Sequence, residues 1–97
     1  MSISLTGRTR RWVTGLLDDI NNERVYETPD YQSYAQRGDK DVLVTARLDW
    51  LYAQDPALVA LGPWVKQVDG QSRRLWELTG DGRLALAQSM VAAGGAR

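Results

Sequence analysis

The sequence predicts one α+β domain, mainly helical, with a two-stranded hairpin, and three observations support this fold class. The chain has 97 residues, which is enough for a single modest core. Residues 64–78 contain two runs typical of strands, separated by an Asp-Gly pair that favours a hairpin turn. Elsewhere the apolar residues recur at helical spacing. We expect one domain over residues 1–97, with flexible ends at 1–7 and 94–97.

The N-terminal half is predicted to contain three helices and one short strand. Residues 8–20 form the first helix, because their apolar side chains lie on one stripe of a 3.6-residue period. Residues 25–26 add a short strand beside the hairpin. A Thr-Pro pair then starts a short helix over residues 28–36, which an Arg-Gly-Asp turn at 37–39 ends. The third helix follows over residues 41–53.

The C-terminal half is predicted to contain a short extra helix, the hairpin and a final helix. Asp-Pro and Gly-Pro pairs bracket residues 56–61, which favours a short extra helix there. A four-residue hairpin loop sets Val65 opposite Trp76, so that one hairpin face is apolar. That register leaves two arginines at the hairpin tip. The final helix covers residues 81–93, with Thr79 as its N-cap.

The first helix carries its charges against the helix dipole. Arg8, Arg10 and Arg11 lie near its positive end, and each such placement costs about 0.3–1 kcal/mol at an exposed site. Two interpretations stay open. Either the arginines are retained for an anionic partner, or they belong to a lead-in before a later helix start.

A short helix, a glycine-bearing turn, a longer helix and a hairpin with a basic tip follow one another in this chain. Together with the run Leu78-Thr79-Gly80-Asp81-Gly82-Arg83 and the apolar helix behind it, this order resembles the winged helix-turn-helix regulators of the MarR and PadR type. The resemblance covers about residues 8–93. It implies a two-stranded wing, a recognition helix over residues 41–53 and double-stranded DNA as the partner. The extra segment at residues 56–61 departs from the family pattern.

Composition excludes several classes of function. The chain has no histidine and no cysteine, so the usual zinc sites and imidazole or thiolate catalysis are unavailable. Residues 80–85 match a dinucleotide-binding fingerprint, but too few residues follow to complete the second strand of that unit. We therefore expect no enzyme, cofactor or metal. The sequence shows no signal peptide and no membrane span, and we expect a cytoplasmic protein.

The leading hypothesis is a small transcriptional regulator that binds operator DNA as a homodimer. The expected DNA-binding residues are Lys40, Thr45, Ala46, Arg47, Arg73 and Arg74. The expected dimer interface on the last helix consists of Leu86, Met90 and Val91. The alternative is a winged-helix adaptor that binds another protein and no DNA. It accounts for the net charge of zero and for an apolar contact surface formed by Leu58, Val59 and Leu61.

Overall fold

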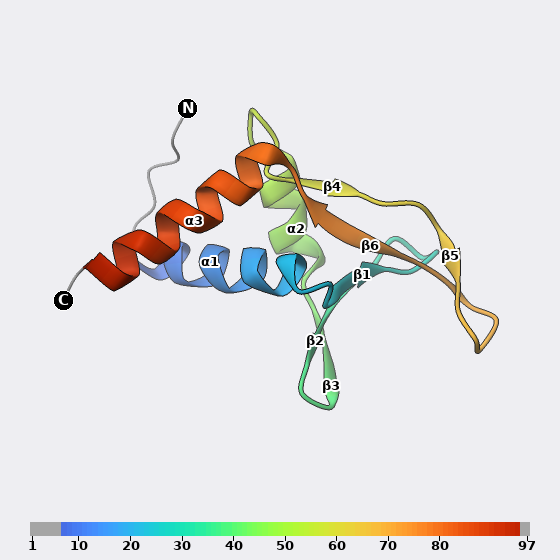
Figure 1. Ribbon diagram of the computed structural model, residues 1–97. Coiled ribbons are helices and arrows are strands. Elements are labelled where there is room, and N and C mark those ends of the chain that lie inside the picture. Colours follow the sequence, from blue (N-terminus) through green and yellow to red (C-terminus); the bar gives the residue numbers. More distant parts are fainter. Residues whose placement is uncertain (1–6, 96–97) are drawn as a thin grey trace.

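The computed structural model describes residues 7–95, and the side chains of residues 7–89, as an α+β fold. Three helices gather at one end of an antiparallel sheet (Figure 1). In chain order the described elements are α1 (Gly7–Asn21), β1 (Val25–Glu27), β2 (Ser33–Arg37), β3 (Lys40–Leu43), α2 (Thr45–Tyr52), β4 (Val59–Leu61), β5 (Val65–Lys66), β6 (Ser72–Leu78) and α3 (Gly80–Gly95). The strand order is β3-β2-β1-β6-β4, and β5 pairs with the first residues of β6.

The prediction of a mainly helical, winged helix-turn-helix fold was wrong. The segment predicted as a short helix over residues 28–36 enters strand β2, and the start of the helix predicted over residues 41–53 lies in strand β3. A β-hairpin therefore occupies the place of the first helix of the motif. The segment at residues 56–61, predicted as an extra helix, contains strand β4. Of the helix-turn-helix only α2 remains.

Turns explain why the first of these segments is extended. The Thr28 N–H donates to the carbonyl of Gln32, and Tyr31 within this turn has a φ of 63°. A left-handed residue stops a helix and reverses the chain. Gly38 has a φ of 66° and connects β2 to β3, where glycine adopts this conformation without strain. The Thr-Pro and Arg-Gly-Asp signals therefore mark two turns.

The core lies between the helices and the face of the sheet that they cover. Four residues of α1 predicted to face inward are buried, Trp12 on the same stripe is partly buried, and they meet side chains from α2 and from the strands. The core cluster consists of Val13, Leu16, Leu17, Ile20, Val25, Ala35, Val44, Leu48, Leu51, Leu58, Val59, Trp76, Leu78 and Leu86. The predicted short strand at residues 25–26 is confirmed, since Tyr26 pairs with Leu75 of β6.

The hairpin at residues 64–78 exists, but its predicted register was wrong. Val65 lies opposite Arg73 and not opposite Trp76. Trp76 instead pairs with Leu61 of β4. The apolar half of β6 is thus covered by β4, and the polar half by β5. Arg73 consequently lies inside a strand pair and not at the hairpin tip.

The start of α3 follows the predicted capping pattern. The Thr79 hydroxyl accepts a hydrogen bond from the N–H of Gly82 at 3.0 Å, which confirms Thr79 as the N-cap. The same hydroxyl donates to the carbonyl of Ala57 at 2.7 Å, and the Thr79 N–H donates to the carbonyl of Leu58 at 3.1 Å. Gly82 is buried against that second carbonyl. The helix start is thereby joined to the chain that leads into β4.

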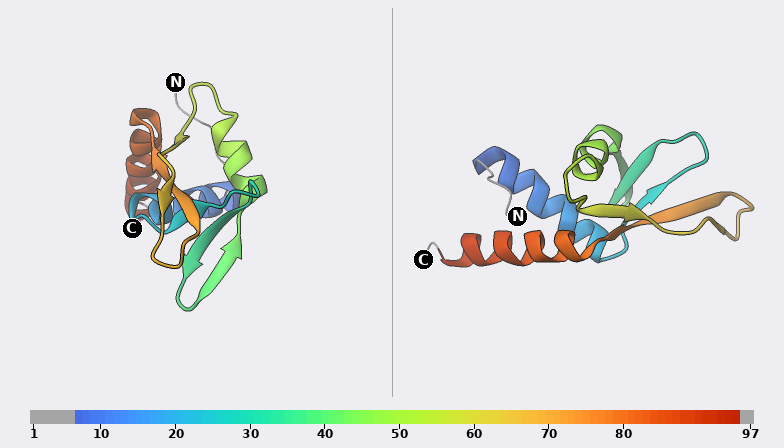
Figure 2. Two further views of the ribbon diagram at one scale, coloured as in Figure 1. Left: turned by 90° about the vertical axis from the view of Figure 1, so that its right-hand side faces the viewer. Right: turned by 90° about the horizontal axis from the view of Figure 1, so that it is seen from above.

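The molecule is elongated because two hairpins extend beyond the helices. The β2–β3 and β5–β6 hairpins point in different directions, as Figure 2 shows from two further sides. Among the residues that the structure describes, no helix is long and apolar enough to span a bilayer.

Candidate nucleic-acid interface

The residues predicted to read DNA are spread over three parts of the molecule. Thr45, Ala46 and Arg47 lie in the first turn of α2. Lys40 is exposed beside the turn of the β2–β3 hairpin, where it pairs with Arg37. The two predicted wing arginines lie on β6. The structure therefore does not place these residues along one helix and one wing.

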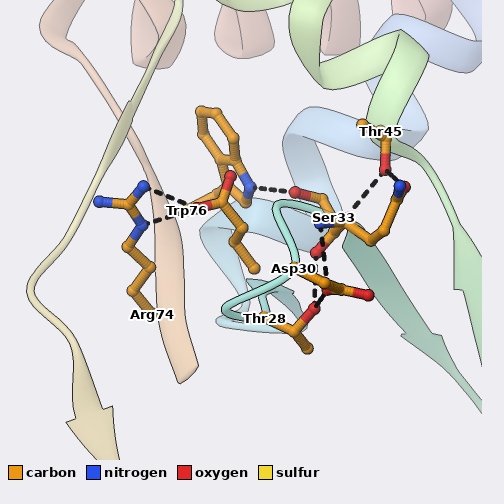
Figure 3. A network of polar contacts seen from close by, with 8 residues as sticks. Thr28, Asp30, Ser33, Thr45, Arg74 and Trp76 are labelled. Carbon is orange, nitrogen blue, oxygen red and sulfur yellow. Dashed lines mark hydrogen bonds and ion pairs between the residues drawn. The ribbon is translucent and has the colours of Figure 1, made fainter. Parts of the chain in front are cut away.

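Thr45 has structural partners inside the protein. Its hydroxyl accepts a hydrogen bond from the Ser33 N–H and donates to the side-chain oxygen of Gln32, each at 2.9 Å. The Ser33 hydroxyl in turn accepts from the indole N–H of Trp76 at 2.9 Å. Figure 3 shows this chain of contacts running from α2 through β2 to β6. Thr45 thus fastens the start of α2 to the sheet.

Replacing Thr45 with valine should therefore lower stability. The substitution keeps the shape but leaves the Ser33 N–H without its acceptor, and a buried donor left unpaired costs about 1–3 kcal/mol. Urea unfolding checks this, with the neighbouring exposed Ala46→Ser as the control. If the two variants unfold at the same urea concentration, Thr45 does not hold α2 in this way.

Arg74 forms a well-shielded ion pair. Its Nε donates to Oε1 of Glu27 at 2.8 Å, and its Nη2 lies 2.6 Å from the same oxygen. The exposed fractions of the two side chains are 22% for Arg74 and 9% for Glu27. The opposite side of the guanidinium lies over the ring of Trp64, 4.6 Å from its centroid. Arg74 is therefore occupied within the protein, and sequence analysis missed its partner Glu27.

A second group of arginines surrounds two tryptophans where α1 meets α2. The guanidinium carbon of Arg47 lies 5.2 Å from the ring centroid of Trp12. The rings of Trp12 and Trp50 meet edge to face, with centroids 5.3 Å apart. Arg8 precedes Trp12 by one helical turn, and Arg11 is its exposed neighbour. We call Arg8, Arg11 and Arg47 the arginine cluster.

The start of α1 distinguishes between the two interpretations of its arginines. The helix begins at Gly7, so Arg8, Arg10 and Arg11 are helical and not part of a lead-in. The first turn of α1 contains no acidic residue. Their positive charges therefore lie near the positive end of the helix dipole, and this arrangement lowers the stability of the folded protein.

Acidic residues lie away from the arginine cluster. Asp49 is two residues beyond Arg47, which places it about 200° around α2, on the opposite side of the helix. At the far end of α1, Asp19 pairs with Arg24 and Arg37 at 3.7 and 3.1 Å. The molecule is neutral overall, and among the described residues Arg47 forms no ion pair with an acidic side chain.

The residues predicted to contact a partner protein or a second copy are largely internal. Leu58 and Val59 belong to the core, with exposed fractions of 3% and 0%, and Leu61 packs against it. Leu86 of α3 is 7% exposed and also belongs to the core. The side chains of Met90 and Val91 lie outside the described residues. Homodimer formation through α3 stays a prediction.

Among residues 7–95 no three acidic side chains come together as a possible metal site. Comparisons of the chain with protein-family models, with curated proteins and with solved structures found no match.

Proposed function

We propose that the protein binds double-stranded DNA through the arginine cluster at the junction of α1 and α2. The observation that supports this proposal is the placement of exposed arginines in the first turns of α1, against the helix dipole. Such a placement costs stability, and an anionic partner would offset that cost. Arg47 adds a charge from α2 beside Trp12, which follows Arg8 by one helical turn.

The tryptophans favour duplex over single-stranded DNA. Single strands are bound by aromatic rings whose faces are open to bases. Trp12 is partly buried, carries Arg47 over its ring, and meets the edge or face of Trp50. The ring of Trp12 therefore supports Arg47 and is not an open stacking surface, while Trp50 is 37% exposed. The arginines would therefore contact the phosphate backbone, a contact that binds duplex DNA without reading its sequence.

The expected affinity for a random duplex depends steeply on salt. Each phosphate contact contributes about 0.9 to the slope of log affinity against log salt, so three contacts lower the affinity about 40-fold between about 50 and about 200 mM. The variant Arg8→Gln/Arg11→Gln/Arg47→Gln should reduce this slope by about 2.7. Fluorescence anisotropy of a labelled duplex measures both quantities. The matched control Lys66→Gln/Arg83→Gln removes two exposed cations from β5 and α3, and it should bind like the wild type.

Charge reversal separates binding from folding. Arg8→Glu/Arg11→Glu should abolish duplex binding and at the same time raise the free energy of unfolding by about 0.3–1 kcal/mol, because the substitution at Arg8 places an acidic residue in the first turn of the helix. A variant that binds duplex as tightly as the wild type would refute the proposal. A wild type with no duplex affinity at either salt concentration would favour the protein-binding adaptor. We further propose that the protein is cytoplasmic, which its composition without cysteine allows.

A further inference from the structure

The face of the sheet opposite the helices contains a groove that the proposed DNA interface does not use. Its volume is about 430 Å³, within the range of small-ligand sites. Strands β1, β2, β5 and β6 and the turn at residues 62–63 line it. Its apolar surface is provided by Leu75, Val65 and Pro63, and its polar groups include Tyr26, Gln36 and Arg73. Leu75 and Val65 are 39% and 54% exposed.

Arg73 is the unusual residue of this groove. Its guanidinium carbon lies 4.4 Å from the ring centroid of Tyr26, so the ring fixes its position. Its Nε atom is buried and has no hydrogen-bond partner. No carboxylate of the described residues forms an ion pair with it, whereas the adjacent Arg74 is paired with Glu27. The buried Nε lies out of reach of a ligand, so an anion in the groove would meet the terminal Nη donors of this positioned guanidinium.

The nearby carboxylates do not satisfy Arg73. Burial raises the pKa of the Tyr26 phenol, and the nearby Asp41 carboxylate raises it further. Tyr26 therefore stays protonated at neutral pH, and its ring adds no negative charge beside Arg73. Glu77 packs against Gly62. A Cβ added to Gly62 would lie 3.2 Å from the Oε1 atom of Glu77.

These acidic groups determine which anion fits. A phosphate dianion would be repelled by Asp41 and by the Glu23 and Glu77 carboxylates of the groove. A carboxylate carries one charge, and its two oxygens match the planar donors of a guanidinium. The exposed Leu75 and Val65 provide apolar contact for a group attached to it. We propose that this groove binds an apolar monocarboxylate, with Arg73 holding the carboxylate group.

The same chemistry occurs in a free aliphatic acid and at the C-terminus of a peptide, and the test separates them. The Nε–Hε resonance of Arg73 in ¹⁵N-labelled protein is followed while hexanoate, N-acetyl-Ala-Leu-Leu or the C-terminal amide of that peptide is added. If only hexanoate shifts the resonance, the ligand is a free aliphatic acid. If only the peptide with a free carboxylate shifts it, the ligand is the C-terminus of a peptide. The amide should have no effect. Inorganic phosphate should bind more weakly than either acid.

Two variants control for the role of the guanidinium. Arg73→Lys keeps the charge but loses the planar pair of N–H donors, and it should bind the effective acid about tenfold or more weakly. Arg83→Gln, exposed on α3 and outside the groove, should bind it like the wild type. No shift of the Arg73 resonance with either acid, or an equal response to phosphate, would overturn the proposal. Neither result depends on duplex binding, so this proposal and the proposed function fail separately.

Discussion

Replacing Gly82 with alanine should lower the melting temperature by more than about 10 °C. A Cβ at this position would lie 1.9 Å from the carbonyl oxygen of Leu58 and 3.0 Å from its carbonyl carbon. That carbonyl accepts the Thr79 N–H, and the Leu58 N–H donates to Leu51. Neither the backbone of Gly82 nor the carbonyl of Leu58 can shift without breaking the junction between α3 and β4. We expect a loss of about 3 kcal/mol, at the upper end of the usual cost of overpacking.

The matched control is the same substitution at Gly15. This glycine is exposed in the middle of α1, and a Cβ there meets no atom within 4 Å. Alanine should therefore raise stability by about 0.5–1 kcal/mol through its better helix propensity. Thermal unfolding followed by circular dichroism compares the two. Equal melting temperatures for Gly82→Ala and the wild type would show that α3 does not approach Leu58 this closely.

Removing the Glu27 carboxylate should be comparably costly. Glu27→Ala leaves the Arg74 guanidinium without its partner in a largely buried position. Breaking buried pairs costs about 3–5 kcal/mol, and we expect the lower end because Arg74 keeps some exposure. Urea unfolding measures the loss. Glu77→Ala, an exposed carboxylate on β6, should change stability by no more than about 0.5 kcal/mol.

A double variant tests the reason for that loss. Glu27→Leu/Arg74→Met replaces both charges with apolar side chains, so no guanidinium is left unpaired. It should recover most of the stability that Glu27→Ala loses, because apolar replacements of buried pairs are often neutral. A loss of under about 1 kcal/mol for Glu27→Ala would instead identify the pair as an ordinary surface ion pair.

Local periodicity predicted the elements that depend on local signals. The apolar stripe of α1 and the capping sequence at Thr79 identified the first and last helices, because helix faces and caps are set within a few residues. It failed over residues 28–43. Ser33 is 1% exposed there, and its partners Trp76 and Thr45 are 43 and 12 residues away. When those partners are unknown, a serine is expected at the surface. The alternation of buried and exposed residues that is typical of a strand is then not recognised in the sequence.

The hairpin register failed for a different physical reason. Matching Val65 to Trp76 assumed that the two hairpin strands supply each other's apolar partners, with only the short strand at residues 25–26 beside them. A further strand, β4, supplies the apolar partners, with Val59 opposite Leu78 and Leu61 opposite Trp76. The proline and glycine residues around 56–61 suggested a helix. Such residues mark the ends of an element but do not determine whether it is a helix or a strand.

The candidate sites were only partly predictable. The unfavourable arginines of α1 are visible in the sequence, since the dipole argument needs only a helix start. The ion pair of Arg74 could not be predicted from the sequence, because its partner Glu27 precedes it by 47 residues. Arg73 and Arg74 are neighbours in the chain, yet a strand points adjacent side chains to opposite faces. Arg74 therefore meets Glu27, whereas Arg73 lies in the groove. Which arginine has which position depends on the face of the sheet that the helices cover.

The position of β6 in the sheet has a consequence for synthesis on the ribosome. This strand pairs with β1, β4 and β5, yet it is the last strand of the described chain to be made. Until Trp76 and Leu78 have emerged, the β1–β3 strands and β4 have no shared neighbour, and α1 lacks part of its core. The nascent chain therefore exposes apolar surface and unpaired strand edges until β6 has emerged, and these are features that chaperones bind. Folding should be completed late and in one cooperative step.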